Sequence, residues 1–222
     1  MPLSAALKVT LTDVAFTLAL VAYVLLVALS LKHMYSKLLA RGHSESLAAY
    51  ISRKTMHIVA AGIPTLLVPY LFSTPIAPSI AALGLAGLLY HKHRSNRLMH
   101  WFQVRENMYE VNFALAWSAS ILALWMVTGD MLVSILPALF ISIGDGVTGL
   151  VRMLCLRKRA KHWLGNIAMM VATLPLGAAL AGAPGAIAAI IASLAEKFEL
   201  KPIDDNILIS VASVVTLAVL YP

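Results

Sequence analysis

Charged residues and cysteine are both scarce in this chain. Only 12% of its 222 residues are Asp, Glu, Lys or Arg, whereas 60% are hydrophobic. A typical soluble domain carries about 25% charged residues. This balance argues against a soluble globular domain and predicts an integral membrane protein. The single cysteine, Cys155, excludes an internal disulfide and most cysteine-based metal sites.

Two common nucleotide-binding signatures are also missing. The chain has no G-x-x-x-x-G-K-[ST] sequence for a P-loop, and it lacks the H-R-D and D-F-G motifs that complete the protein-kinase set. It has no internal repeat and no low-complexity tract, so we expect residues 1–222 to form a single integral membrane domain. In a soluble protein the net charge of +7 would suggest nucleic acid. In this chain membrane topology and anionic headgroups explain that charge, and no nucleic-acid partner is expected.

The chain does contain a series of apolar segments. A transmembrane helix needs about 17 to 25 predominantly apolar residues. The segments predict an all-α fold, a polytopic transmembrane helix bundle with about eight spans. They are residues 11–31, 56–72, 75–90, 111–127, 131–151, 164–182, 184–196 and 206–221. The seventh begins at Pro184-Gly185, which could make it half of a broken helix.

The basic residues lie almost entirely in alternate loops. Sixteen of the 17 Lys and Arg residues fall within 32–54, 91–110, 152–163 and 197–201, and the intervening turns carry none. Eight spans place these four loops on the same face, which the positive-inside rule makes cytoplasmic, with both termini outside. We therefore expect a multi-pass membrane protein, in the plasma membrane if the source is prokaryotic, with its active site facing the cytoplasm.

The strongest local signal is the sequence Ile-Ser-Ile-Gly-Asp-Gly-Val-Thr-Gly at 141–149. An ionisable residue within a hydrophobic span is costly, so Asp145 is a functional candidate by default. The flanking Gly144 and Gly146 lack side chains and would let a ligand or metal approach the carboxylate closely. The alternative is structural: Asp145 pairs with an arginine and the glycines permit close helix packing.

A basic segment precedes the predicted sixth span. The run 157–159 is typical of a topology determinant, whereas Lys161 adjoins Gly165 and Asn166 where a helix should begin. Backbone amide groups at a helix start favour anions. These three residues therefore predict a phosphate site.

Acidic residues gather around the end of the seventh predicted span. Glu196 is followed by Asp204, Asp205 and Asn206. A carboxylate cluster suits Mg²⁺, which takes a few carboxylates and shares phosphate oxygens. The alternative is a solvated loop, to which we assign Glu199, with Asp204 or Asp205 capping the last helix.

Two further polar groups begin spans on the same predicted face. Arg53, Lys54 and His57 open the second span, where Arg53 and His57 are one helical turn apart and could meet a common anion. A histidine at this position could instead be a capping or interfacial residue. Glu110 and Asn112 open the fourth span close to hydrocarbon depth, where each needs a polar partner.

Taken in order, these motifs resemble those of the polyprenol kinase family, which includes dolichol kinases and phytol kinases. The matching features are Arg-Lys-x-x-His, an acidic helix start, Gly-Asp-Gly, Lys-x-Trp-x-Gly-Asn-x-Ala-Met, and Glu with a downstream Asp-Asn. They lie at 53–57, 106–112, 144–146, 161–169 and 196–206. Each motif is short, so the resemblance depends on their order and spacing.

The resemblance implies a CTP-dependent kinase that phosphorylates the hydroxyl of an isoprenoid alcohol with Mg²⁺ on the phosphates. Asp145, together with Glu196 and Asp205, would hold the metal or nucleotide, and Lys161 and Arg53 would neutralise phosphate charge. Asp145 could also accept the hydroxyl proton, since a base and a metal ligand both require a carboxylate near the reacting oxygen. The lipid tail would lie between spans with its hydroxyl at the cytoplasmic boundary.

Some features leave the substrate alcohol open. Members of the family often have Gly-Ser where this chain has Gly165-Asn166, and a small apolar residue where it has Thr148. Lipid length and saturation, the nucleotide base and the oligomeric state are also open.

Two other functions are possible. The related phosphatidate cytidylyltransferases transfer CMP to a lipid phosphate, but their closing pattern of His-Gly-Gly and Asp-Arg-x-Asp is missing here. A non-enzymatic transporter or scaffold would use Asp145 in an ion path. The nearly apolar first and eighth spans argue against that function.

Overall fold

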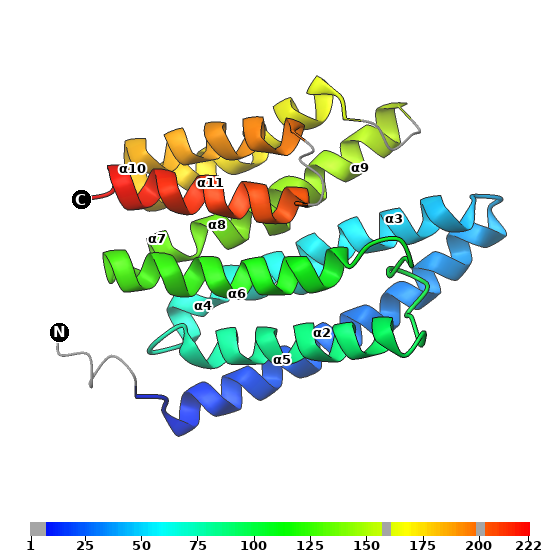
Figure 1. Ribbon diagram of the computed structural model, residues 1–222, viewed down its shortest axis with the longest axis horizontal. Helices are drawn as coiled ribbons and strands as arrows, with labels where there is room; N and C mark the ends of the chain where they lie inside the picture. Colours follow the sequence, from blue (N-terminus) through cyan, green and yellow to red (C-terminus); the bar gives the residue numbers. More distant parts are fainter. Residues whose placement is uncertain (1–7, 157–160, 199–202) are drawn as a thin grey trace.

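The computed structural model describes residues 8–156, 161–198 and 203–222, and this part of the chain is all-α (Figure 1). We predicted an all-α bundle, and this is confirmed. The elements are α2 (Leu11–Ala40), α3 (Glu45–Met56), the π-helix η1 (His57–Gly62), α4 (Ile63–Leu71), α5 (Ile76–Arg94), α6 (Tyr109–Thr128), α7 (Met131–Ser134), α8 (Leu136–Leu139), the π-helix η2 (Phe140–Gly144), α9 (Asp145–Leu156), α10 (Trp163–Lys197) and α11 (Asp205–Leu220).

The prediction of eight spans is wrong. Within the described residues, four helical stretches are long and apolar enough to cross a membrane: Leu11–Ala40, Tyr109–Thr128, Met131–Leu156 and Trp163–Lys197. The other predicted spans fall short for different physical reasons. The second is divided between η1 and the nine-residue α4. The third lies in α5, which extends beyond the predicted span and ends in four consecutive basic or histidine residues. The last, α11, has 16 residues.

The sixth and seventh predicted spans are two arms of one element, α10. Its backbone leaves the helical region at Ala181 and at Gly182, where φ is 59°, a value that glycine adopts without steric cost. Asn166 and Ser193 then bind each other across the two arms: Asn166 Nδ2 donates to the Ser193 carbonyl (2.5 Å) and Ser193 Oγ donates to the Asn166 carbonyl (2.6 Å). The broken helix therefore folds back on itself and returns Glu196 to the end where α10 began.

The hydrophobic core surrounds α8 and η2, where Leu136, Leu139 and Phe140 are fully buried. The two π-helical segments η1 and η2 contact each other beside this core. Their wider turn rotates the side chains that follow, and such segments are frequent at functional sites. Here His57 opens η1 and Asp145 directly follows η2. The interruptions thus aim two polar side chains at each other inside an apolar bundle.

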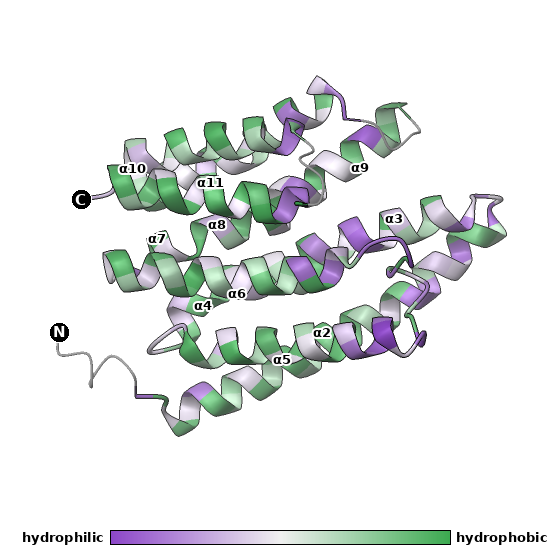
Figure 2. Cartoon of the chain, viewed as in Figure 1, coloured by the Kyte–Doolittle hydropathy of each residue, from purple (hydrophilic) through white to green (hydrophobic). Residues whose placement is uncertain are grey.

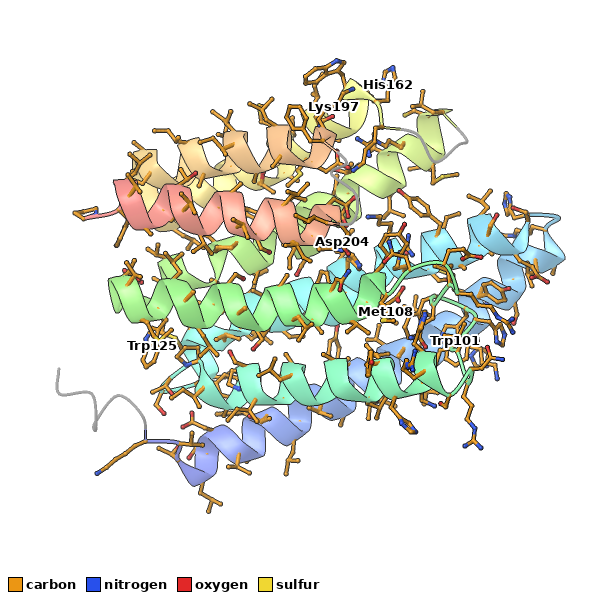
Figure 3. All side chains as sticks on the ribbon, in the orientation of Figure 1. Trp101, Met108, Trp125, His162, Lys197 and Asp204 are labelled. Atoms are coloured by element: carbon orange, nitrogen blue, oxygen red, sulfur yellow. The ribbon has the colours of Figure 1, made fainter. Side chains whose placement is uncertain are left out.

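Hydrophilic residues gather at one end of the bundle (Figure 2). They colour the beginnings of α6 and α11, the end of α10 and the loop that joins α5 to α6, while the opposite halves of these helices are apolar. Figure 3 locates Trp101, Met108, His162, Lys197 and Asp204 at this polar end, and Trp125 at the other. The candidate site lies where this polar end meets the apolar bundle.

Candidate functional site

Asp145 is a deeply buried acidic group of the site. Its side chain is 1% exposed, and its two carboxylate oxygens accept hydrogen bonds from Lys54 Nζ at 2.6 and 2.5 Å. His57 Nδ1 lies 3.2 Å from the same carboxylate. The sequence-based alternative paired Asp145 with an arginine, whereas its partner is the lysine of the Arg-Lys-x-x-His motif. Both lysine and carboxylate are buried, so each depends on the other for its charge compensation.

Glu196 forms a second buried group with two cations. Arg152 NH1 and NH2 bind its two carboxylate oxygens at 2.8 and 2.7 Å in a bidentate pair, and Lys161 Nζ donates to Oε1 at 2.6 Å. Lys161 also donates to Asp205 Oδ2 at 3.0 Å. Bidentate arginine pairing fixes both the position and the orientation of a carboxylate. Glu196 is therefore held rigidly, whereas Lys161 and Asp205 lie closer to solvent.

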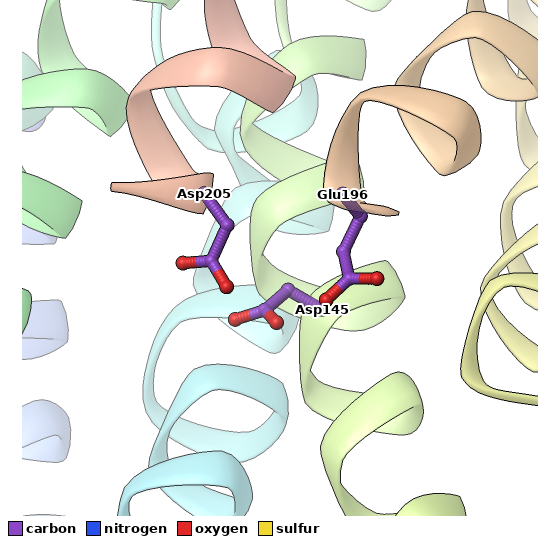
Figure 4. Close-up of side chains that lie close together, drawn as sticks. All are labelled: Asp145, Glu196 and Asp205. Carbon is purple, nitrogen blue, oxygen red and sulfur yellow. The ribbon is translucent and has the colours of Figure 1, made fainter. Parts of the chain in front are cut away.

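Three carboxylates converge at the junction of α9, α10 and α11. Ligand atoms of Asp145, Glu196 and Asp205 all lie within 4.8 Å of one another, and Figure 4 shows the side chains directed at a shared space. Oxygen donors of this kind suit Mg²⁺, which accepts one or two carboxylates alongside phosphate oxygens and water. These residues, predicted from separate motifs, are brought together.

The glycines and Asn166 support the site through packing and a hydrogen bond to Glu196. A Cβ on Gly144 would crowd Thr173 and Met169, and one on Gly146 would crowd Ile58. Both glycines thus permit close helix packing, the structural alternative named above. Gly165 makes room for the Arg152 guanidinium. Asn166 is buried and its amide lies 3.2 Å from Glu196 Oε2, so it supports Glu196.

Glu110 and its neighbours border the site on the α6 side. Arg53 stacks on the Tyr109 ring at 4.3 Å, and its NH1 lies 3.7 Å from Glu110 Oε1. Asn112 donates to Asp204 Oδ2 at 2.9 Å, while Asp204 caps α11 by accepting from the Ile207 amide. The capping interpretation is thereby confirmed for Asp204, which lies outside the three-carboxylate cluster.

Two cavities meet at these residues. The larger, of about 750 Å³, has both polar and apolar walls and contains the charged groups of the site: it is bordered by the three carboxylates and by Lys54, Arg152, Lys161 and Asn206. The smaller, of about 150 Å³, is apolar apart from one end and lies among α2, α5, α6 and the segment from α3 to α4. Arg53 and His57 line both. A polar chamber therefore adjoins an apolar one, with a cation and an imidazole at the boundary.

The titration behaviour of the groups outside the four long apolar helices follows their surroundings. Burial has the largest single effect on Lys54 and would lower its pKa, but Asp145, Tyr50 and Asp205 together raise that pKa above its usual value. Burial likewise opposes the charge of Lys161, yet Asp205 and Glu196 raise its pKa. Burial raises the pKa of Asp204, and the hydrogen bond from Asn112 only partly offsets this. Both lysines therefore remain protonated at neutral pH.

Arg152 is the main residue that sequence reasoning missed. We assigned it to a basic loop, but α9 continues to Leu156, so Arg152 is a buried residue of that helix. Its spacing of seven residues from Asp145 was the available signal, because side chains two helical turns apart share one face. The predicted topology residues Arg157, Lys158, Arg159 and Lys201 and the predicted loop residue Glu199 lie outside the described residues.

Comparisons of this chain with protein-family models, with curated proteins and with solved structures found no match.

Proposed function

We propose that this protein is a membrane-embedded kinase that transfers the γ-phosphoryl group of CTP to the hydroxyl of an isoprenoid alcohol. The observation that supports this most directly is the carboxylate cluster of Asp145, Glu196 and Asp205 in a polar cavity that adjoins an apolar one. The choice of CTP and of an isoprenoid alcohol rests on the motif order in the sequence. Phosphoryl transfer needs mainly positioning and charge neutralisation, and the residues present are sufficient for both.

The donor set fits Mg²⁺. The cluster offers oxygen ligands only, and the larger cavity, about 750 Å³, lies within the usual size range of small-molecule sites. When bound, Mg²⁺ would supply charge neutralisation on the phosphate oxygens. Lys54 and Lys161 would turn from their carboxylates toward the phosphates, while Arg152 keeps Glu196 oriented. The carboxylates released by the lysines are then free to serve as metal ligands.

An apolar acceptor is supported by the smaller cavity. Its walls come from apolar side chains such as Leu20, Leu85 and Trp117, and its polar end carries Arg53, His57 and Glu110. This arrangement matches a molecule with an apolar tail and one polar group. A soluble sugar or amino-acid acceptor would leave its polar atoms without partners there.

For the membrane setting, we propose a multi-pass protein whose polar end faces the cytoplasm. The four long apolar helices meet the length and composition for spanning. Lys and Arg concentrate in the segments at the polar end, as the positive-inside rule expects for a cytoplasmic face.

The test is transfer of label with purified protein in detergent. CTP labelled at the γ or the α phosphate is incubated with Mg²⁺ and either isoprenoid alcohols or phosphatidate. The expected result is γ label on the alcohol, lost with EDTA and restored by Mg²⁺. Glu196→Gln should abolish transfer, whereas Glu45→Gln, an exposed glutamate far from the cluster in sequence, should not. Label from the α position on phosphatidate would support a cytidylyltransferase instead, and no turnover with any lipid would refute both enzymatic functions.

A further inference from the structure

The structure assigns the acceptor side of the reaction to Glu110: we infer that its carboxylate binds the alcohol hydroxyl and takes the hydroxyl proton, while the first segment of the lipid tail fills the small apolar cavity. This inference rests on the proposed function and deepens it. It also separates two tasks that the sequence left together at Asp145, namely proton acceptance and metal ligation.

Glu110 is buried without a hydrogen-bond partner. It is 5% exposed, and neither of its carboxylate oxygens accepts a hydrogen bond from any described residue. Its nearest cation, Arg53 NH1, is 3.7 Å away, which is longer than a hydrogen bond. A buried carboxylate left in this condition costs free energy and calls for an explanation such as an absent ligand. A donor delivered by a bound alcohol would satisfy it.

Among the described residues, both carboxylate oxygens of Asp145 already have partners, unlike those of Glu110. Lys54 occupies both of its oxygens at 2.5 to 2.6 Å, and His57 lies 3.2 Å away. Asp145 also belongs to the three-carboxylate cluster, whereas Glu110 does not. Metal ligation and proton acceptance compete for the same lone pairs. The carboxylate with free oxygens that lines the apolar cavity is therefore the better acceptor of the hydroxyl proton.

The apolar cavity determines how much of the alcohol is recognised. Its volume is about 150 Å³, and an apolar cavity of about that size binds benzene, so it would enclose about one isoprene unit. Arg53, His57 and Glu110 lie at one end of this cavity, and Thr17 also contributes to its lining. The enzyme would then bind the isoprene unit that bears the hydroxyl, and the rest of the tail would stay in the bilayer. Affinity should accordingly depend weakly on chain length.

The transfer step balances with these residues. The hydroxyl oxygen forms a bond to the γ-phosphorus while its proton passes to Glu110. The bond from the γ-phosphorus to the β,γ-bridging oxygen breaks, and CDP leaves with the electron pair. Arg53, which lines both cavities, is placed to contact the transferred phosphoryl group on its way between them. The proton returns to water when the phosphorylated lipid departs.

The experiment measures farnesol binding, CTP binding and turnover separately on folded protein in detergent. For Glu110→Gln we expect kcat to fall by about a hundredfold or more, as for loss of a general base. Farnesol affinity should weaken by about tenfold, since the hydrogen bond to a charged carboxylate becomes a weaker one to a neutral amide, while CTP affinity stays unchanged. Glu45→Gln is the matched control and should alter none of the three. Retained turnover in Glu110→Gln, or equal losses of CTP and farnesol binding, would overturn the inference.

A second pair of variants tests the cavity without touching Glu110. Ala81→Phe on α5 fills the cavity and should raise the KM for farnesol with little change in CTP affinity, whereas Leu88→Phe on the exposed face of the same helix should do neither. An unchanged KM in Ala81→Phe would place the tail elsewhere and refute the inference. The proposed function can fail independently. If farnesol binding depends on Glu110 but no phosphoryl group is transferred from CTP, the kinase function is refuted and the alcohol-binding site at Glu110 is retained.

Discussion

The buried pair of Lys54 and Asp145 permits a test that separates stability from catalysis. Asp145→Asn preserves the shape of the side chain but removes the charge that Lys54 Nζ contacts at 2.5 to 2.6 Å. Lys54 is 5% exposed and would be left as an uncompensated buried cation. Breaking a buried ion pair from one side costs about 3–5 kcal/mol. For a chain of this size that corresponds to a fall in Tm of roughly 10 °C.

Removing both charges should reverse the loss of stability. In Lys54→Met/Asp145→Asn no uncompensated charge is left buried, which removes the main cost of breaking the pair from one side. We therefore expect a Tm near that of the wild type and a large coupling between the two substitutions in a double-mutant cycle. Under the proposed function, turnover should stay at least a hundredfold below wild type in both variants, because a carboxylate of the proposed metal site is lost.

The assay combines thermal unfolding in detergent with the initial rate of phosphoryl transfer per folded molecule, and Glu45→Gln serves as control. If Asp145→Asn unfolds at the same Tm as the wild type, Lys54 and Asp145 do not form a buried ion pair that depends on both charges. An active double variant would remove Asp145 from the catalytic machinery and leave it a structural residue.

Three further outcomes can be measured. Gly165→Ala should displace the Arg152 guanidinium, which occupies the space of the added methyl group, and lower turnover by at least about tenfold with a smaller change in CTP affinity. Lys161→Ala should weaken CTP binding and leave farnesol binding unchanged; because nearby carboxylates raise the lysine pKa, its contribution should persist undiminished from pH 6 to 9. Single cysteines at Arg41 and Arg97, in a cysteine-free background, should react with an impermeant thiol reagent from the cytoplasmic side only, and labelling from opposite sides would refute the shared face.

The sequence identified most of the carboxylates and cations of the site, because charged residues are conspicuous in an apolar chain. Asp145 was predicted from its position within a hydrophobic span, and Glu196 and Asp205 from a carboxylate cluster that suits Mg²⁺. The structure brings all three within 4.8 Å of one another. Their pairing was not predictable. Lys54 and Asp145 are 91 residues apart in sequence, and hydropathy carries no information about which helices become neighbours.

The number of spans was overestimated for a different reason. Hydropathy segments identify apolar stretches but not interruptions of the backbone. The turn at Ala181 and Gly182 joins two arms into one element, and η1 divides the helical stretch from Glu45 to Leu71. The same limitation hid Arg152, since a helix that continues beyond its apolar segment converts an expected loop residue into a buried one. Sequence reasoning thus located the polar residues better than the helix ends.

The charge arrangement of the cluster explains why metal and nucleotide would bind together under the proposed function. Among the described residues, Lys54, Arg152 and Lys161 compensate Asp145, Glu196 and Asp205. A nucleotide alone would draw the lysines toward phosphate and leave carboxylates unpaired, and a metal ion alone would leave the lysines unpaired. Each of these states is costly in a buried site. Only the two ligands together would leave no group unpaired: Lys54 and Lys161 would move to phosphate oxygens, the carboxylates would bind the metal, and Arg152 would stay paired with Glu196. Such mutual dependence is a coupling free energy, and it must act equally on both ligands.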